Sequence, residues 1–226
     1  MARAVKRGST SREVGIALLV YGLYLLVRGL VLRSGGRDRG RRNAERIRSL
    51  EERAGVAVEP ALQRLALRLP RLVHGLNVGY PVFNVGLTVG WLLVLHRRRD
   101  PGYPRLRRAC VAAHVCAQPV FLVAPVAPPR TLPGYVDTLA VVSGLDLEHP
   151  LLVRFYNPVA AMPSLHAAFA VVTAAALAER APPRLVAAGA SAYPLLVTAV
   201  VVATGNHFVL DAAAGAVLGG IAWRLA

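Results

Sequence analysis

Six apolar runs divide this chain of 226 residues, and most are close to the roughly 20 residues that a helix needs to cross a bilayer. A segment inside a membrane must satisfy its own backbone hydrogen bonds, which favours helices. The composition agrees, because 55% hydrophobic residues and a mean hydropathy of +0.46 are too apolar for an ordinary soluble domain. We therefore predict an all-α membrane protein, a bundle of six transmembrane helices. The predicted spans are Val14–Leu32, Leu76–Leu95, Ala109–Ala127, Leu165–Ala178, Leu185–Ala203 and Phe208–Ala222.

The first run, Val14–Leu32, follows basic residues and has to be distinguished from a signal peptide. It is too long for the apolar core of a typical signal peptide. The residues after it, Arg33-Ser34-Gly35-Gly36, contain no A-x-A cleavage site. We interpret the run as a retained first span.

A polar, helical segment separates spans one and two. Asn43–Arg53 is predicted to be an exposed helix that ends at Gly55. Pro60–Leu72 has leucines on one side, which fits either an amphipathic helix at the membrane interface or a linker helix against the bundle. We accordingly divide the chain into an N-terminal anchor with its basic and amphipathic segment, 1–75, and a catalytic membrane domain, 76–226.

The net charge of +15 comes almost entirely from arginine, since Lys6 is the only lysine. These charges lie in the linkers between apolar runs rather than along one polar face, so we expect contact with anionic lipid headgroups and no nucleic acid. The positive-inside rule places the arginine-rich loop His96–Arg108 in the cytoplasm. Counting spans from there puts 128–162 and 204–208 outside. It also puts Ser34–Gly75 outside, in conflict with that segment's arginines.

The bias toward alanine, arginine and valine suggests a bacterial protein, and hence the plasma membrane. The count of spans then predicts that a site in 128–162 and 204–208 is extracytoplasmic. Cys110 and Cys116 are six residues apart, on nearly opposite faces of a helix, so no disulfide between them is expected. The chain has no cysteine spacing typical of a metal site, and we predict neither a metal nor another cofactor.

Two histidines lie where predicted spans meet water. His166 follows Pro163, a residue suited to the first turn of a helix, where free backbone amides favour anions. His207 and Asp211 are four residues apart, which places them on one face of a helix. A carboxylate that fixes the tautomer of one histidine, with a second histidine as acid and base, is an arrangement suited to phosphoryl transfer. We predict His207, Asp211 and His166 as catalytic residues.

Non-bridging phosphate oxygens need donors, and planar arginine side chains suit them well. Arg130 and Arg154 are the loop arginines nearest to His166 in sequence, and Ser164 lies in the same helical turn. We predict these three as phosphate-binding residues. The plainer interpretation is that an H-x-x-x-D pair arises by chance and that a membrane histidine merely bonds a neighbouring helix. Two histidines predicted on the same side of the membrane, together with a carboxylate, favour the functional interpretation.

The sequence Pro163-Ser164-Leu165-His166, with His207-x-x-x-Asp211, resembles two motifs of the type-2 phosphatidic acid phosphatase superfamily, and most closely its inositol phosphorylceramide synthase-like branch. This resemblance implies a six-helix membrane bundle with a non-cytoplasmic site. It implies that His207 is the nucleophile that becomes phosphohistidine, Asp211 its orienting partner and His166 the acid and base. The sequence departs from the superfamily pattern where Val200 and Val201 replace a Ser-Arg pair. It also departs from the K-x6-R-P pattern: Arg130 is the candidate arginine, but Val123 stands at the lysine position and Thr131 replaces the proline.

We therefore expect an integral membrane phosphatase or phosphotransferase that acts on a membrane lipid phosphate. The acceptor is either water or a polar or lipid alcohol, and the resemblance favours transfer of an inositol-phosphate-type headgroup. The alternative is a non-catalytic lipid-binding or transport protein on the same fold. The paired halves with interrupted helices that are typical of transporters are not evident in the sequence.

Overall fold

The computed structural model describes residues 9–81, 85–180 and 183–226, and within these residues the chain is helical, with one isolated β-bridge and no strand. The all-α prediction is confirmed. The longer helices are α1 (Thr10–Arg33), α2 (Gly36–Ala54), α3 (Glu59–Leu67), α4 (Pro70–Pro81), α5 (Leu87–Arg97), α6 (Tyr103–Val123), α7 (Thr138–Ser143), α8 (Leu165–Ala178), α9 (Pro183–Ala203) and α10 (Val209–Leu225).

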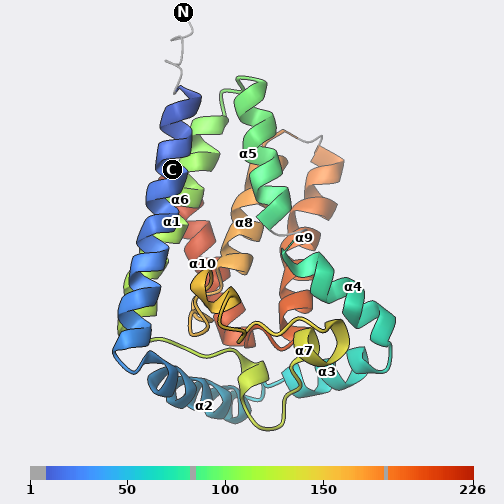
Figure 1. The fold of residues 1–226 in the computed structure, drawn as a ribbon. Coiled ribbons are helices and arrows are strands. Elements are labelled where there is room, and N and C mark those ends of the chain that lie inside the picture. The colour runs from blue at the N-terminus through green and yellow to red at the C-terminus, as the bar shows by residue number, and fades with distance from the viewer. Residues whose placement is uncertain (1–8, 82–84, 181–182) are drawn as a thin grey trace, which may run out of the picture.

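Helix α8 forms the centre of the bundle, where it packs against α5, α6, α9 and α10 (Figure 1). Helix α1 runs along the outer side of α6. Helices α2, α3 and α7 lie across the lower end of the bundle as drawn, and the α5–α6 turn lies at the opposite end. The polar segment and the arginine-rich 96–108 loop are therefore at opposite ends of the molecule.

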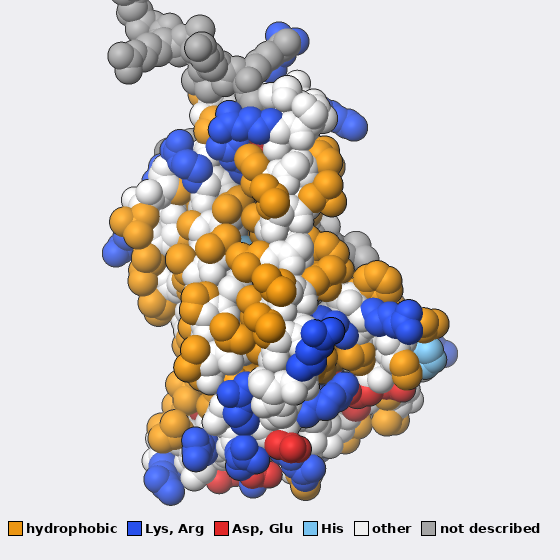
Figure 2. All heavy atoms as spheres, turned by 60° about the vertical axis from the view of Figure 1, so that its left-hand side comes forward, with side chains coloured by type: hydrophobic (Ala, Val, Ile, Leu, Met, Phe, Trp, Pro, Cys, Tyr) orange, Lys and Arg blue, Asp and Glu red, His pale blue; other side chains and the backbone are white. Residues whose placement is uncertain are grey.

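Two of the described helices, α1 and α6, are long and apolar enough to cross a membrane, and α5 and α8 are shorter apolar helices. Most of α1 is not buried by other helices: Leu18 and Leu19 are 66% and 75% exposed. Figure 2 shows apolar side chains over the middle of this face and basic side chains toward its two ends. An apolar surface of this extent needs a lipid environment, so the chain is a membrane protein.

The predicted span Leu76–Leu95 is formed by two helices, α4 and α5, and part of it, 82–84, lies outside the described residues. The span predicted to begin at Ala109 begins earlier, at Tyr103, with Pro104 in its first turn. It ends at Val123, before Pro125, which cannot donate a hydrogen bond to continue the helix. Cys110 and Cys116, both in α6, are free, as predicted.

The prediction of an exposed helix for Asn43–Arg53 was wrong for one face. Helix α2 ends at Gly55, as predicted, but the residues at every third or fourth position face the protein and are buried. Gly40 lets the backbone approach so closely that its carbonyl accepts a hydrogen bond from the amide of Ala127 at 3.0 Å. A methyl group at Gly40 would lie 2.8 Å from the Val159 side chain. The many charges of α2 obscured this buried row of small residues.

The predicted helix Pro60–Leu72 is divided into α3 and the start of α4, because Pro70 cannot continue α3. Helix α3 packs against α9 with Gln63 and Ala66 buried, whereas Leu65 and Leu69 are each 59% exposed. The helix therefore packs on the bundle, with Leu62 against the core and Leu65 outward, and contact of Leu65 and Leu69 with the membrane interface stays a prediction.

Candidate active site

The two histidine-containing segments meet where α8 and α10 begin. The amide of Ser164 donates to the carbonyl of Asp211 at 2.9 Å, which joins the two helix starts directly. Glycines four residues apart in α10 permit this contact, because a methyl group at Gly215 would lie 2.1 Å from the Ser164 carbonyl oxygen. A methyl group at Gly219 would lie 2.4 Å from the carbonyl oxygen of Ala168. Small residues at this spacing allow membrane helices to approach closely.

His207 lies in the turn before α10 rather than within the helix, so the expectation that His207 and Asp211 share a helical face needs correction. The turn is tight, with Gly205 at φ 73°, and the amide of His207 donates to the carbonyl of Val201 at 3.1 Å. The carboxylate of Asp211 nevertheless faces the ring: Nδ1 of His207 is 3.6 Å from Oδ2 of Asp211. That oxygen also accepts a hydrogen bond from the amide of Phe208 at 2.9 Å.

A separation of 3.6 Å is an ion-pair distance and is too long for a good hydrogen bond. Both residues are buried, and Asp211 is fully so. A buried carboxylate beside Nδ1 favours the tautomer with the proton on Nδ1 and leaves Nε2 as the basic nitrogen. His207 is therefore held with one nitrogen toward a carboxylate and the other toward the second histidine.

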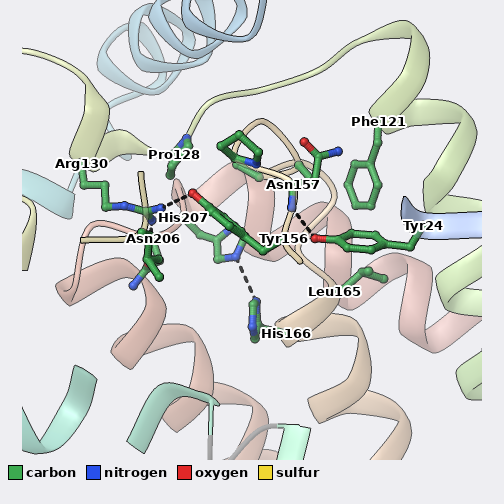
Figure 3. Close-up of a pocket in the computed structure, with 14 residues that line it drawn as sticks. Tyr24, Phe121, Pro128, Arg130, Tyr156, Asn157, Leu165, His166, Asn206 and His207 are labelled. Atoms are coloured by element: carbon green, nitrogen blue, oxygen red, sulfur yellow. Dashed lines mark hydrogen bonds between the residues drawn. The ribbon is translucent and has the colours of Figure 1, made fainter. Parts of the chain in front are cut away.

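His166 lies in the first turn of α8 and faces His207. Its Nδ1 is 3.2 Å from Nε2 of His207, so the two rings are within hydrogen-bonding distance (Figure 3). The structure thus brings together all three predicted catalytic residues, from two helix starts that are about 40 residues apart in sequence. A phosphoryl group that enters between the rings can contact both of them.

Both histidines line a cavity of about 330 Å³. Its walls come from α1, α6 and the 128–165 segment as well as from the two histidine segments, and half of its lining residues are apolar. They are Tyr24, Phe121, Pro128, Arg130, Leu147, Tyr156, Asn157, Pro158, Ala160, Ala161, Leu165, His166, Asn206 and His207.

Arg130 is the only arginine among the described residues that line this cavity, and it is buried. Its guanidinium donates to the side chain of Asn206 and to the hydroxyl of Tyr156, the latter at 3.2 Å. Its Nε lies 3.5 Å from the carboxylate of Asp137. These contacts fix a permanent positive charge next to the His207 turn, as Figure 3 shows.

The other two predicted phosphate-binding residues lie elsewhere. Arg154 is exposed and is not among the described residues that line the cavity. Ser164 is fully buried and caps α8, where its Oγ accepts from the amide of Ala167 at 3.3 Å. Its hydroxyl therefore serves the helix start.

Sequence reasoning missed four polar residues of the cavity, Tyr24, Tyr156, Asn157 and Asn206. Burial raises the pKa of Tyr156 to about 12, so its phenol stays protonated and can donate to Glu148. Asn157 is 4% exposed, and its buried side-chain nitrogen has no hydrogen-bond partner in the structure. Asn157 and Asn206 directly adjoin the histidine segments in sequence, which was the available signal.

Among the described residues, no three His, Cys, Asp or Glu side chains are grouped so that they could hold a metal ion. The chemistry available from the side chains themselves is nucleophilic attack by an oriented imidazole, proton transfer by a second one and charge stabilisation by a buried guanidinium. This is the set that phosphoryl transfer through a histidine requires.

Comparison with known proteins gave one match. A family model described as the PAP2 superfamily matches residues 45–225, which include α8, α10 and every polar residue of the cavity except Tyr24. No curated protein and no solved structure gave a significant match. The matched range covers most of the chain, and therefore this membrane protein belongs to the PAP2 superfamily.

Proposed function

We propose that this protein transfers a phosphoryl or phosphodiester group from a membrane lipid through a covalent intermediate on His207. The observation that carries the proposal is that Nε2 of His207 faces His166 in one cavity with Arg130, while Nδ1 faces Asp211. Membership of the PAP2 superfamily is consistent with a lipid phosphatase or phosphotransferase.

In the first step, Nε2 of His207 attacks the phosphorus and the bond to the leaving lipid oxygen breaks. His166, in its protonated form, donates a proton to that oxygen. The positive charge that develops on the His207 ring is stabilised by Asp211. Arg130 holds the non-bridging oxygens, where its planar donors match the phosphoryl geometry.

In the second step, neutral His166 removes a proton from the acceptor, and the acceptor oxygen attacks phosphorus as the bond to His207 breaks. Water as acceptor gives a phosphatase, and an alcohol gives a transferase. Both acceptors use the same residues. Transfer of an inositol phosphate is the specific form that the sequence resemblance favours.

A lipid substrate fits the walls of the cavity. Tyr24 and Phe121 come from α1 and α6, the two helices long and apolar enough to span a membrane. We infer that six segments cross the bilayer, namely α1, α4 with α5, α6, α8, α9 and α10. The site then lies near the non-cytoplasmic surface, opposite the arginine-rich turn, with the lipid chains between helices.

The decisive experiment compares purified wild type with His207→Ala and with His74→Ala, a control at an exposed histidine outside the cavity. Each is given a panel of lipid phosphates with and without inositol or a lipid alcohol. We follow both free phosphate and lipid products. Free phosphate lost only in His207→Ala identifies a phosphatase, and a new lipid product lost only in that variant identifies a transferase.

Asp211→Asn tests the orienting role separately. An amide removes the charge that stabilises the His207 ring, and we expect kcat/KM to fall by up to about 10⁴-fold, as for the corresponding change in a serine-protease triad. Retained activity in His207→Ala would refute the assignment of His207 as the nucleophile. Binding of lipid phosphates without turnover in the wild type would instead support the non-catalytic alternative.

A further inference from the structure

Two buried glutamates from outside the cavity hold the start of the helix that carries Asp211. Glu51, in α2, accepts the amide of Leu210 at 2.7 Å, and Glu59, the first residue of α3, accepts the amide of Val209 at 2.8 Å. Both glutamates are fully buried. The first amides of a helix have no partner within it, so these two carboxyl groups satisfy donors that immediately follow His207.

The two glutamates also interact with each other. The second carboxylate oxygen of each is buried with no hydrogen-bond partner, and the interaction with Glu59 is one of the causes that raise the pKa of Glu51. Two carboxyl groups can share a hydrogen bond only if one of them carries a proton. Adjacent buried carboxyl groups disfavour a double negative charge, as in the paired carboxyls of aspartic proteases. Such a pair favours one shared proton and one negative charge.

The surroundings of the pair favour retention of that proton. Asp211 of α10 is a second negative neighbour of Glu51, and the charges of the two glutamates raise the pKa of the Tyr135 phenol in the loop. Arg48, a basic group on α2, is ion-paired with Glu52 toward the surface. Burial, the bond to Glu59 and the charge of Asp211 raise the pKa of Glu51 to about 8.

We propose that Glu51 and Glu59 are positioning residues for the histidine chemistry, a proton-sharing pair that fixes the α10 start and so holds His207 and Asp211 in their reactive arrangement. This inference rests on the proposed function. Loss of the shared proton places a second charge beside Asp211, breaks the bond between α2 and α3 and loosens the His207 turn. Activity then falls at alkaline pH.

The direction of the pH effect follows from the raised pKa. The proton on Glu51 contributes its full stabilisation of the folded protein below pH 4.5, the ordinary pKa of glutamate. This contribution is lost as the pH rises through about 8, the raised pKa. Burial raises the pKa of Tyr135 to about 12, so that phenol does not titrate in this range. An alkaline loss near pH 8 is therefore the signature of the pair.

Glu51→Gln is the informative variant. Its amide oxygen can still accept from Leu210 and its amide nitrogen can donate to Glu59, so the bonds remain without a titrating proton. We expect kcat/KM at pH 7 within about twofold of wild type and an alkaline fall displaced upward by at least one pH unit. Glu51→Ala removes the acceptor, and kcat/KM should drop about tenfold or more at every pH. Glu52→Gln, at an exposed neighbour, is the matched control.

The second measurement needs no substrate: the apparent Tm of each variant in detergent from pH 5 to 10. We expect the Tm of the wild type and of Glu52→Gln to fall toward pH 8, and that of Glu51→Gln to fall less. If the activity and the Tm of Glu51→Gln both fall at alkaline pH as far as those of the wild type, the proposal that Glu51 and Glu59 form a positioning pair is overturned. Absence of His207-dependent turnover in the wild type overturns the proposed function instead, and the Tm comparison still decides whether the pair shares a proton.

Discussion

The contact between α8 and α10 offers the sharpest test of how the site is assembled. A methyl group added at Gly215 would lie 2.1 Å from the carbonyl oxygen of Ser164, whereas ordinary contacts begin at 3.4 Å. The obstacle is backbone, which cannot rotate aside. In Gly215→Ala the two helix starts must therefore separate by about 1.3 Å, the difference between these two distances.

This displacement has two measurable costs. Overpacking of this kind destabilises a protein by about 1–3 kcal/mol, which corresponds to a Tm lower by roughly 2–12 °C for a chain of this size. The same shift stretches the bond from the Ser164 amide to the Asp211 carbonyl and moves His166 relative to His207. A misplacement of about 1 Å costs on the order of 10²-fold in rate.

The assay compares Gly215→Ala with Gly220→Ala by thermal unfolding in detergent and by kcat/KM on the lipid phosphate that the wild type turns over. Gly220 is in the same helix, and a methyl group there has nothing within 4 Å. Alanine is favoured over glycine in a helix by up to about 1 kcal/mol, so this control should be as stable as wild type or slightly more so. Wild-type Tm and rate in Gly215→Ala would refute the close approach of α8 and α10.

Three further predictions concern other contacts. Arg130→Lys keeps the charge but loses the planar donors, so KM for a lipid phosphate should rise about tenfold with little change in Tm. Asn77→Ala removes the buried bonds between α4 and Thr138, and chemical unfolding should show a loss of about 2–3 kcal/mol. Arg180 lowers the pKa of Asp100, which contributes stability above its ordinary value of 3.8 that is lost as the pH falls through the lowered pKa. The Tm of Asp100→Asn should therefore depend less on acid pH than that of wild type.

The proximity of the three predicted catalytic residues could be predicted from the sequence because its signals are local. His166 sits in the first turn after a proline, and the spacing of His207 and Asp211 brings them together even though the turn before α10 is not helical. The chemistry limits the residue types, so few alternatives compete. Arg130 could be identified for a similar reason. The proposed phosphate group needs a cationic side chain, and the loop before His166 contains few of them.

The rest could not be predicted because it depends on contacts between residues distant in sequence. Arg154 is closer to His166 in sequence than Arg130, yet it is exposed, because the loop turns it outward before Tyr156 and Asn157 enter the cavity. Nothing in the residue order reveals that turn. The inner face of α2 was likewise hidden, since its small buried residues alternate with arginines that dominate the composition.

The buried glutamates explain why an arginine-rich segment covers the site. Helix α10 begins after a buried turn, and its first amides, those of Val209 and Leu210, donate to buried carboxyl groups. Asp211 uses one oxygen for the amide of Phe208 and faces His207, so the next two amides require acceptors from elsewhere. Acceptors with full negative charges would crowd Asp211, and a pair that shares one proton supplies two acceptors with a single charge. The position of α2 across the site is thus a requirement of the helix start that carries Asp211.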